Sequence, residues 1–172
     1  MAHCPAGVAL ALLIAVTMVT AAQLPAQEQA APGRDTFWFG IGLGAGSEDF
    51  AGNLHGSYQF GANLISVRNA ATAGIFDDGF GDFALLYGRA TKPSGRRHHA
   101  SAAIGIGVAD GCRGGGLGGC QDVSAVVGLP IEAQLFWRPG SLVGVGLYGF
   151  ANFNAARSFA GLTLGLQIGR LR

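Results

Sequence analysis

Four polar residues could supply the chemistry of a hydrolase: His55, Ser57, Ser66 and Glu132. A serine hydrolase needs a serine, a histidine and an acid that converge at one point. The sequence has no G-x-S-x-G nucleophile motif. Alternation in the flanking segments also turns His55, Ser57 and Glu132 toward an interior, away from a membrane substrate. We therefore predict a non-enzymatic protein with no catalytic residue and no cofactor.

Three charged residues lie well within alternating segments that carry few charges: Arg68, Arg89 and Glu132. We assign all three to the small, polar face of those segments. An unpaired charge in a low-dielectric interior is costly, so we expect Glu132 to pair with Arg68, Arg89 or both. This charge network is predicted to be a structural plug, with a proton or ion relay as the alternative. Further polar side chains are expected to line the same interior, namely His55, Gln59, Gln134 and Gln167.

Glycine-rich and acidic stretches do not fit phosphate or metal sites. Gly40–Gly46 has no following helix or Walker lysine, and alternate glycines are better explained by close packing. The segment "DDGFGD" lacks the ligand order of an EF-hand loop and its closing glutamate. Arg96–His99 could touch anionic lipid or peptidoglycan, or bind a metal weakly, but a solvated turn is the default. We therefore predict no metal site.

The cysteines and the N-terminus suggest an exported chain. Val8–Val19 has the length of a signal-peptide apolar core, and small residues follow it, so cleavage is expected after Ala22 or Ala26. An N-terminal membrane anchor is the alternative. In an oxidising compartment Cys112 and Cys120 are expected to form a disulfide, with a zinc site as the rival reading. We expect residues 1–26 to be the signal peptide, 27–35 a flexible lead-in and 36–172 one folded domain.

The rest of the sequence has the composition and pattern of an all-β membrane domain. The whole chain contains 30 glycines among 172 residues, 49% hydrophobic residues and only 12% charged residues. About 25% charged residues is usual. No segment shows a helical period. Instead, alternation of apolar with small or polar residues predicts eight strands, at about 36–46, 53–60, 63–71, 82–91, 99–109, 122–137, 141–153 and 158–172. Pro130 predicts a bulge or bend at Gly128–Pro130 within one continuous strand.

The apolar faces are expected to point outward into lipid. The opposite faces carry few charges, unlike a water-facing surface, and their small side chains suit the narrow interior of an eight-stranded barrel. The strand lengths fit a tilted membrane crossing of about 9–11 residues. Aromatic residues gather near the strand ends, as in the two girdles of a transmembrane barrel. The connections on one side carry most of the acids, and those on the other carry Lys92, Arg96, Arg97 and Arg138.

The segments "GLPIEAQLFWRP", "VGLYGFANFN" and "SFAGLTLGLQIG" resemble a family of small, uncharacterised bacterial outer-membrane β-barrel proteins. The resemblance implies an eight-stranded barrel and no activity. We predict an eight-stranded antiparallel up-and-down transmembrane β-barrel in the bacterial outer membrane, with a structural or surface-interaction role. Its expected partners are outer-membrane lipid and the barrel-assembly machinery; it is expected to be a monomer and to bind no nucleic acid. The alternative is a narrow transport or hydrophobic-ligand-binding barrel, which could instead be soluble and periplasmic.

Overall fold

The computed structural model of the chain describes residues 35–74, 79–91, 97–114 and 121–171. The predicted signal peptide and all of the lead-in except Asp35 lie outside this part. No helix in the described part is long and apolar enough to cross a membrane. Its secondary structure consists of strands, and these are β1 (Thr36–Gly46), β2 (Asp49–Phe60), β3 (Asn63–Ala73), β4 (Gly79–Ala90), β5 (His98–Arg113), β6 (Gln121–Trp137), β7 (Val143–Asn154) and β8 (Phe159–Arg170).

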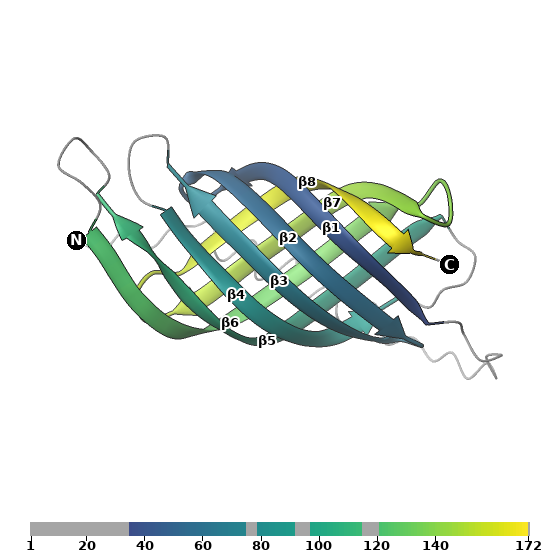
Figure 1. Ribbon diagram of the computed structural model, residues 1–172, viewed down its shortest axis with the longest axis horizontal. Helices are drawn as coiled ribbons and strands as arrows, with labels where there is room; N and C mark the ends of the chain where they lie inside the picture. The colour runs from purple at the N-terminus through teal and green to yellow at the C-terminus, as the bar shows by residue number, and fades with distance from the viewer. Residues whose placement is uncertain (1–34, 75–78, 92–96, 115–120, 172) are drawn as a thin grey trace. The chain divides into compact units, whose positions relative to one another are not determined.

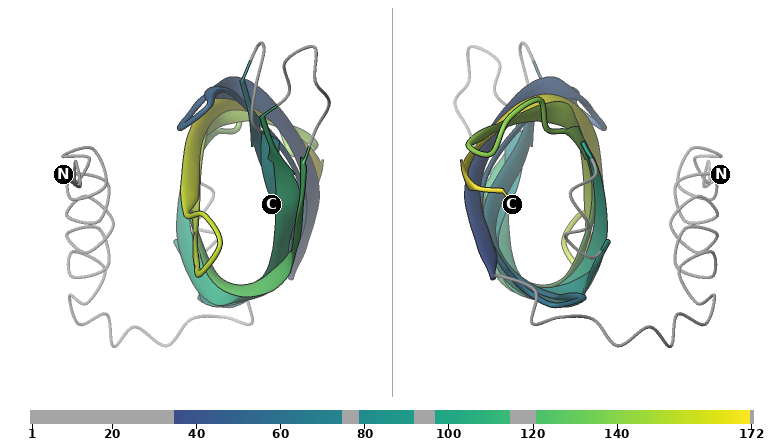
Figure 2. Two further views of the ribbon diagram at one scale, coloured as in Figure 1. Left: turned by 90° about the vertical axis from the view of Figure 1, so that its left-hand side faces the viewer. Right: turned by 90° about the vertical axis from the view of Figure 1, so that its right-hand side faces the viewer.

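The strands form one closed barrel in which each strand pairs with its neighbours in the sequence. All pairings are antiparallel, and β1 pairs with β8 to close the ring. Figure 1 shows the strands tilted across the barrel, and Figure 2 shows the ring from its two ends. We call the end with the β1–β2, β3–β4, β5–β6 and β7–β8 connections the loop end. We call the opposite end, where β1 begins and β8 finishes, the termini end.

Alternation in the sequence determines which side of the barrel each residue faces. In β1, Trp38 is 1% exposed and points into the barrel, whereas Phe39 is 65% exposed and Leu43 is 76% exposed. The same pattern repeats around the ring, so the outer surface is a belt of leucine, isoleucine, valine and aromatic side chains. A closed barrel has no unpaired strand edge, and an apolar outer belt is the surface that hydrocarbon requires. The predicted fold and the outward direction of the apolar faces are therefore confirmed.

Glycines line the interior where another side chain needs the space. A Cβ added to Gly40 would collide with the imidazole of His55, which lies on the neighbouring strand β2. A Cβ on Gly128 would likewise collide with the side-chain amide of Asn152 on β7. The high glycine content therefore makes room for large polar side chains inside a narrow barrel.

Several details of the strands differ from the sequence prediction; β2, for example, begins at Asp49 rather than at about residue 53. The register of β6 against β5 is the same on both sides of Pro130, so the bulge expected at Gly128–Pro130 is wrong, although the β5–β6 ladder is interrupted at Leu129 and Pro130. The bend given as the alternative stays a prediction. The register shift lies instead between Ala109 and Gly111, nearer the loop end. Strand β4 also begins at Gly79 rather than Asp82. This earlier start places Asp82 inside the barrel wall, with its side chain in the interior.

Candidate functional site in the barrel interior

A buried ion pair between Arg68 on β3 and Asp82 on β4 lies at the centre of the interior. Arg68 Nη2 donates to Asp82 Oδ2 at 2.7 Å and Arg68 Nε donates to Oδ1 at 3.2 Å, and both side chains have no solvent-exposed area. Two-point contact of this kind matches a guanidinium to a carboxylate. Arg68 also donates to the backbone oxygens of Ile131 at 2.7 Å and Ala151 at 3.0 Å. Asn152 Nδ2 donates to Asp82 Oδ2 at 2.7 Å.

A second polar group is centred on Glu132 of β6. Its carboxylate accepts hydrogen bonds from the hydroxyl of Tyr148 on β7 and from Gln134 Nε2, the latter at 3.0 Å. Gln134 Oε1 in turn accepts from Gln167 Nε2 at 3.0 Å and from Trp38 Nε1 at 3.3 Å. These bonds connect four strands, β6, β7, β8 and β1, across the interior. They satisfy the Glu132 carboxylate, which is 4% exposed.

His55 contacts this network by stacking on Tyr148 and by a hydrogen bond with Asn53. Its ring stacks on Tyr148, with centroids 4.5 Å apart and an interplanar angle of 18°. Its Nδ1 lies 3.0 Å from Asn53 Nδ2, and Asn53 Oδ1 accepts from Thr163 Oγ1 at 2.6 Å. Polar side chains thus bridge the interior in several directions.

Apolar side chains close the interior on both sides of this polar centre. Phe80 and Phe159, near the loop end of β4 and β8, are each 3% exposed and belong to one buried cluster. Trp38, Leu64 and Leu171 belong to a second buried cluster near the termini end. Both clusters lie inside the ring on either side of the polar centre, so the described interior is filled; the termini end also buries the polar side chains of Gln59, His99 and Arg138. A barrel of eight strands leaves just enough width for side chains to fill it.

All the residues predicted from the sequence to line the interior lie inside the barrel, except Arg89. Arg68 and Glu132 lie inside, but they do not pair with each other, since the carboxylate that contacts Arg68 belongs to Asp82. Gln59 lies at the termini end, where its Nε2 donates to the backbone oxygens of Gly61 and Thr91. The other predicted polar residues are also buried inside, namely His55, Gln134 and Gln167.

Arg89 is a correction, because the structure places it on the outer surface. It is exposed and shares the outward face of β4 with Tyr87, which is 54% exposed. Strict alternation explains the placement, since the two residues are separated by one position. Arg89 is the second-last residue of β4, near the termini end, where a long cationic side chain can reach the membrane–water boundary. It therefore takes no part in the interior charge network.

Several residues of the network were missed by sequence reasoning. Asp82 was predicted as the first residue of a strand, after an acidic and glycine-rich connection, and was not included in the interior charge network. Tyr148 and Asn152 lie in β7, where the alternation is less regular. Asp82 could have been found from its position, because it shares the interior face with Ala84 and Leu86 two and four residues later.

The interior shows no arrangement suited to nucleophilic or metal chemistry among the described residues. Ser57 Oγ lies 3.2 Å from Ser66 Oγ, so the two serines pair with each other, and the Nδ1 of His55 faces Asn53. No group of three histidine, cysteine or acidic residues in the described part could hold a metal ion. Cys120 lies outside the described residues, so the disulfide with Cys112 stays a prediction.

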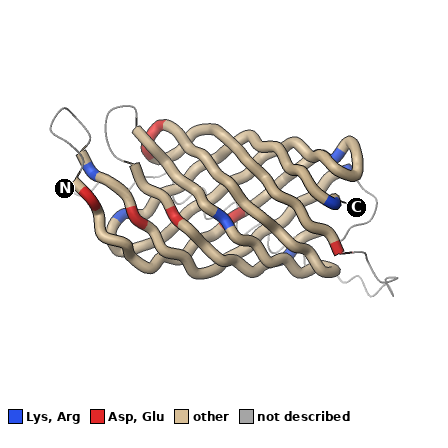
Figure 3. Tube along the Cα trace, in the orientation of Figure 1, with Lys and Arg blue, Asp and Glu red and all other residues tan. Residues whose placement is uncertain are grey.

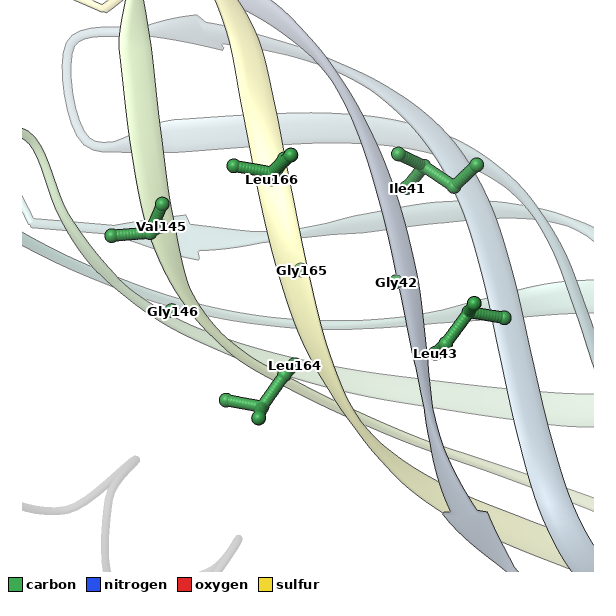
Figure 4. Close-up of a pocket in the computed structure, with 8 residues that line it drawn as sticks. All are labelled: Ile41, Gly42, Leu43, Val145, Gly146, Leu164, Gly165 and Leu166. Carbon is green, nitrogen blue, oxygen red and sulfur yellow. The ribbon is translucent and has the colours of Figure 1, made fainter.

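Charged residues gather toward the two ends of the barrel and are few along its wall (Figure 3). The outer wall carries an apolar groove of about 420 Å³ where β1, β8 and β7 run side by side. Glycines form its floor, and Figure 4 shows apolar side chains on both sides of them. The groove offers no polar side chain, and it is lined by Ile41, Gly42, Leu43, Val145, Gly146, Leu164, Gly165 and Leu166.

No protein-family model and no curated protein sequence matches the chain. Solved structures do match its fold. Neisserial surface protein A matches with a TM-score of 0.56 at 10% identity, over 78% of this chain and 94% of that one. The N-terminal β-barrel domain of OprF from Pseudomonas aeruginosa matches with a TM-score of 0.60 at 7% identity, over 80% and 98%. Ail, the attachment invasion locus protein of Yersinia pestis, matches with a TM-score of 0.55 at 13% identity, over 81% and 99%. The chain therefore has the fold of small eight-stranded outer-membrane barrels.

Proposed function

We propose that the chain is a non-enzymatic barrel of the bacterial outer membrane that serves a structural or surface-interaction role through its loop end. The filled interior carries this proposal. The Arg68–Asp82 pair and the Glu132 group span the middle of the barrel, and apolar side chains close it on both sides. A barrel that is filled in this way suits the role of a membrane anchor better than that of a pore.

Outer-membrane placement is supported by the apolar belt of a closed barrel. Such a surface needs hydrocarbon around it, and strands rather than helices form the wall. The fold shared with outer-membrane proteins agrees with this placement. Outer-membrane lipid and the barrel-assembly machinery are accordingly its proposed partners.

The loop end is the proposed interaction surface. Arg157 Nη2 forms a salt bridge with Glu48 Oε1 at 2.7 Å, and its guanidinium lies 5.2 Å from the centre of the Phe80 ring. Asn154 holds the β7–β8 turn, with Oδ1 accepting from the backbone nitrogens of Ala156 and Arg157. Two of the similar structures are titled as a surface protein and an attachment invasion locus protein, which favours a surface role here.

A planar-bilayer recording tests the sealed interior. The purified barrel is expected to give no steady conductance above that of lipid alone. Tyr148→Ala, which removes a side chain from the polar centre, is expected to open a measurable current. Leu164→Ala on the outer wall is the matched control and should stay silent. A steady current through the unaltered barrel that changes with Glu132→Ala would instead support the transport alternative.

Cell fractionation and cysteine labelling test the location and the orientation. The protein is expected in the outer-membrane fraction, with different gel mobility before and after boiling. In a Cys112→Ser, Cys120→Ser background, a membrane-impermeant maleimide should label Ala155→Cys on intact cells, because that residue is exposed at the loop end. Gly140→Cys at the termini end should be labelled only after lysis. Recovery as a soluble periplasmic protein, or the reverse labelling pattern, would contradict the proposal.

A further inference from the structure

One polar residue, Asn69 on β3, faces outward in the middle of the apolar belt. It is exposed, and so is Val67, the preceding outward residue of the strand. Across the ladder it pairs with Leu54 on β2 and Phe83 on β4, which are 58% and 62% exposed. Leu54 lies midway between the outward aromatic residues Phe50 and Tyr58 of its strand. Asn69 is therefore at hydrocarbon depth rather than at the membrane boundary.

The amide of Asn69 has no hydrogen-bond partner in the barrel. No side-chain hydrogen bond reaches it from residues 35–74, 79–91, 97–114 or 121–171. The other outward-facing asparagine of β3, Asn63, lies at the termini end, and its Oδ1 accepts a hydrogen bond from the Tyr87 hydroxyl at 3.0 Å. An amide without a partner in hydrocarbon is unfavourable by several kcal/mol. A partner outside this chain would therefore stabilise the surface around Asn69.

The surface on the loop-end side of Asn69 consists largely of small residues, whereas Leu54 and Phe83 flank Asn69 itself and Phe50 lies opposite Ala73. Gly52, Ala71 and Gly81 pair across β2, β3 and β4 in the next outward row. Ala73 and Gly79 continue the small surface toward the loop end. Small residues allow backbones to approach each other in a membrane, and polar side chains between them then form hydrogen bonds. We call Gly52, Asn69, Ala71, Ala73 and Gly81 the Asn69 face.

We infer that the Asn69 face is a self-association surface, and that its partner is a second copy of this chain in the same membrane. A primary amide carries both donors and an acceptor, so two Asn69 side chains related by a two-fold axis can satisfy each other. No charged residue belongs to the face itself, and the exposed Asp110 on β5, directly opposite Gly81, borders it. The inference rests on the proposed membrane placement. It replaces the monomer expected from the sequence.

Two other features of the outer wall lack this combination. Ala102, Ala133 and Gly149 form a second row of small residues across β5, β6 and β7, which carries no side-chain amide; on β4 the row continues to Arg89, opposite Ala102. The groove shown in Figure 4 is entirely apolar, so acyl chains satisfy it fully. The second small row therefore offers a matched control for size without the amide.

Energy transfer between labelled copies in phosphatidylcholine vesicles tests the inference. The full chain carries donor or acceptor dyes at Gly140→Cys in a Cys4→Ser, Cys112→Ser, Cys120→Ser background, and the protein-to-lipid ratio is varied. We expect a concentration-dependent dimer. Asn69→Leu should raise its dissociation constant roughly tenfold or more, whereas Asn69→Gln, which keeps an amide, should retain most of the association. Ala71→Phe should abolish it, and Ala133→Phe should leave it unchanged.

Heat-modifiable gel mobility of each vesicle sample shows separately that the variant is folded and inserted. A protein that fails to insert contradicts the membrane placement and not the dimer alone. An inserted protein that stays monomeric at every ratio overturns the inference. So does a dimer that is insensitive to Asn69→Leu, or one that Ala133→Phe disrupts as strongly as Ala71→Phe. Binding of a lipid at Asn69 by a monomer, detected by native mass spectrometry, would also overturn it.

Discussion

Arg68 and Asp82 join β3 to β4 inside the barrel through two hydrogen bonds, of 2.7 and 3.2 Å. Neither side chain has solvent-exposed area. Removing one partner therefore leaves the charge of the other buried without its counter-charge.

Asp82→Ala is expected to lower the free energy of unfolding by about 3–5 kcal/mol, because it leaves the Arg68 charge buried without a carboxylate. Urea unfolding in lipid vesicles, followed by the loss of heat-modifiable gel mobility, measures the change. The double variant Arg68→Met, Asp82→Leu should lose less stability than Asp82→Ala, since it leaves no charge behind. A double variant that is less stable than the single one would contradict this account of the pair.

Tyr148→Phe should lower the free energy of unfolding by about 1–3 kcal/mol, because Glu132 loses a buried donor while the ring can still stack on His55. The same unfolding assay applies. Tyr58→Phe is the matched control, since its hydroxyl donates to Asp35 at an exposed site. Equal effects of the two changes would show that the Glu132 contact is not a buried stabilising bond.

Gly40→Ala is expected to destabilise the barrel by about 1–3 kcal/mol, because the new methyl group needs the space of the His55 ring. Combining it with His55→Ala should give a double variant that is more stable than the sum of the single effects predicts. A double-mutant cycle of unfolding free energies measures this coupling. Gly140→Ala, where nothing lies within 4 Å of an added Cβ, is the neutral control. Strictly additive effects would mean that Gly40 is not reserved for His55.

The two tryptophans report which face meets lipid. Trp38 is 1% exposed inside the barrel and Trp137 is 43% exposed on the outer wall. Brominated lipid should quench the fluorescence of Trp38→Phe, which retains Trp137, far more than that of Trp137→Phe. Ordinary lipid of the same chain length supplies the unquenched reference. Stronger quenching of Trp38 would reverse the direction assigned to the strands.

The fold could be predicted from the sequence because each strand of the barrel has one face toward an apolar exterior and the other toward a crowded, more polar interior. In β1 the outward residues are apolar, and the inward residues are small or polar except for Trp38, so Thr36–Gly46 was located without error. The interior was harder to predict. Asp82 follows glycines that resemble a turn, and only the ladder from Gly79 shows that the strand has already begun. Arg89 was assigned to the interior because of its charge, although it lies two positions after Tyr87 and therefore shares the outward face.

Pairing between Arg68 and Asp82 could not be read from spacing alone. In the register of β3 and β4, Arg68 lies directly opposite Ala84, and the ion pair runs diagonally to Asp82. The long side chain of Arg68 therefore contacts a carboxylate two residues away from its direct partner in the ladder. The bulge was misplaced for a similar reason, because β6 accommodates Pro130 without a change of register.

The seam between β1 and β8 differs from every other pairing in the barrel. All other neighbouring strands follow one another in the chain, whereas β1 and β8 bring Phe37 opposite Arg170. Closing so long a loop carries the largest conformational-entropy penalty of any pairing. The seam also contains two glycine–glycine pairs, with Gly42 opposite Gly165 and Gly46 opposite Gly161. Neighbouring strands can therefore pair one after another along the chain. The β1–β8 pairing is expected to form last during folding and to separate first under an applied force.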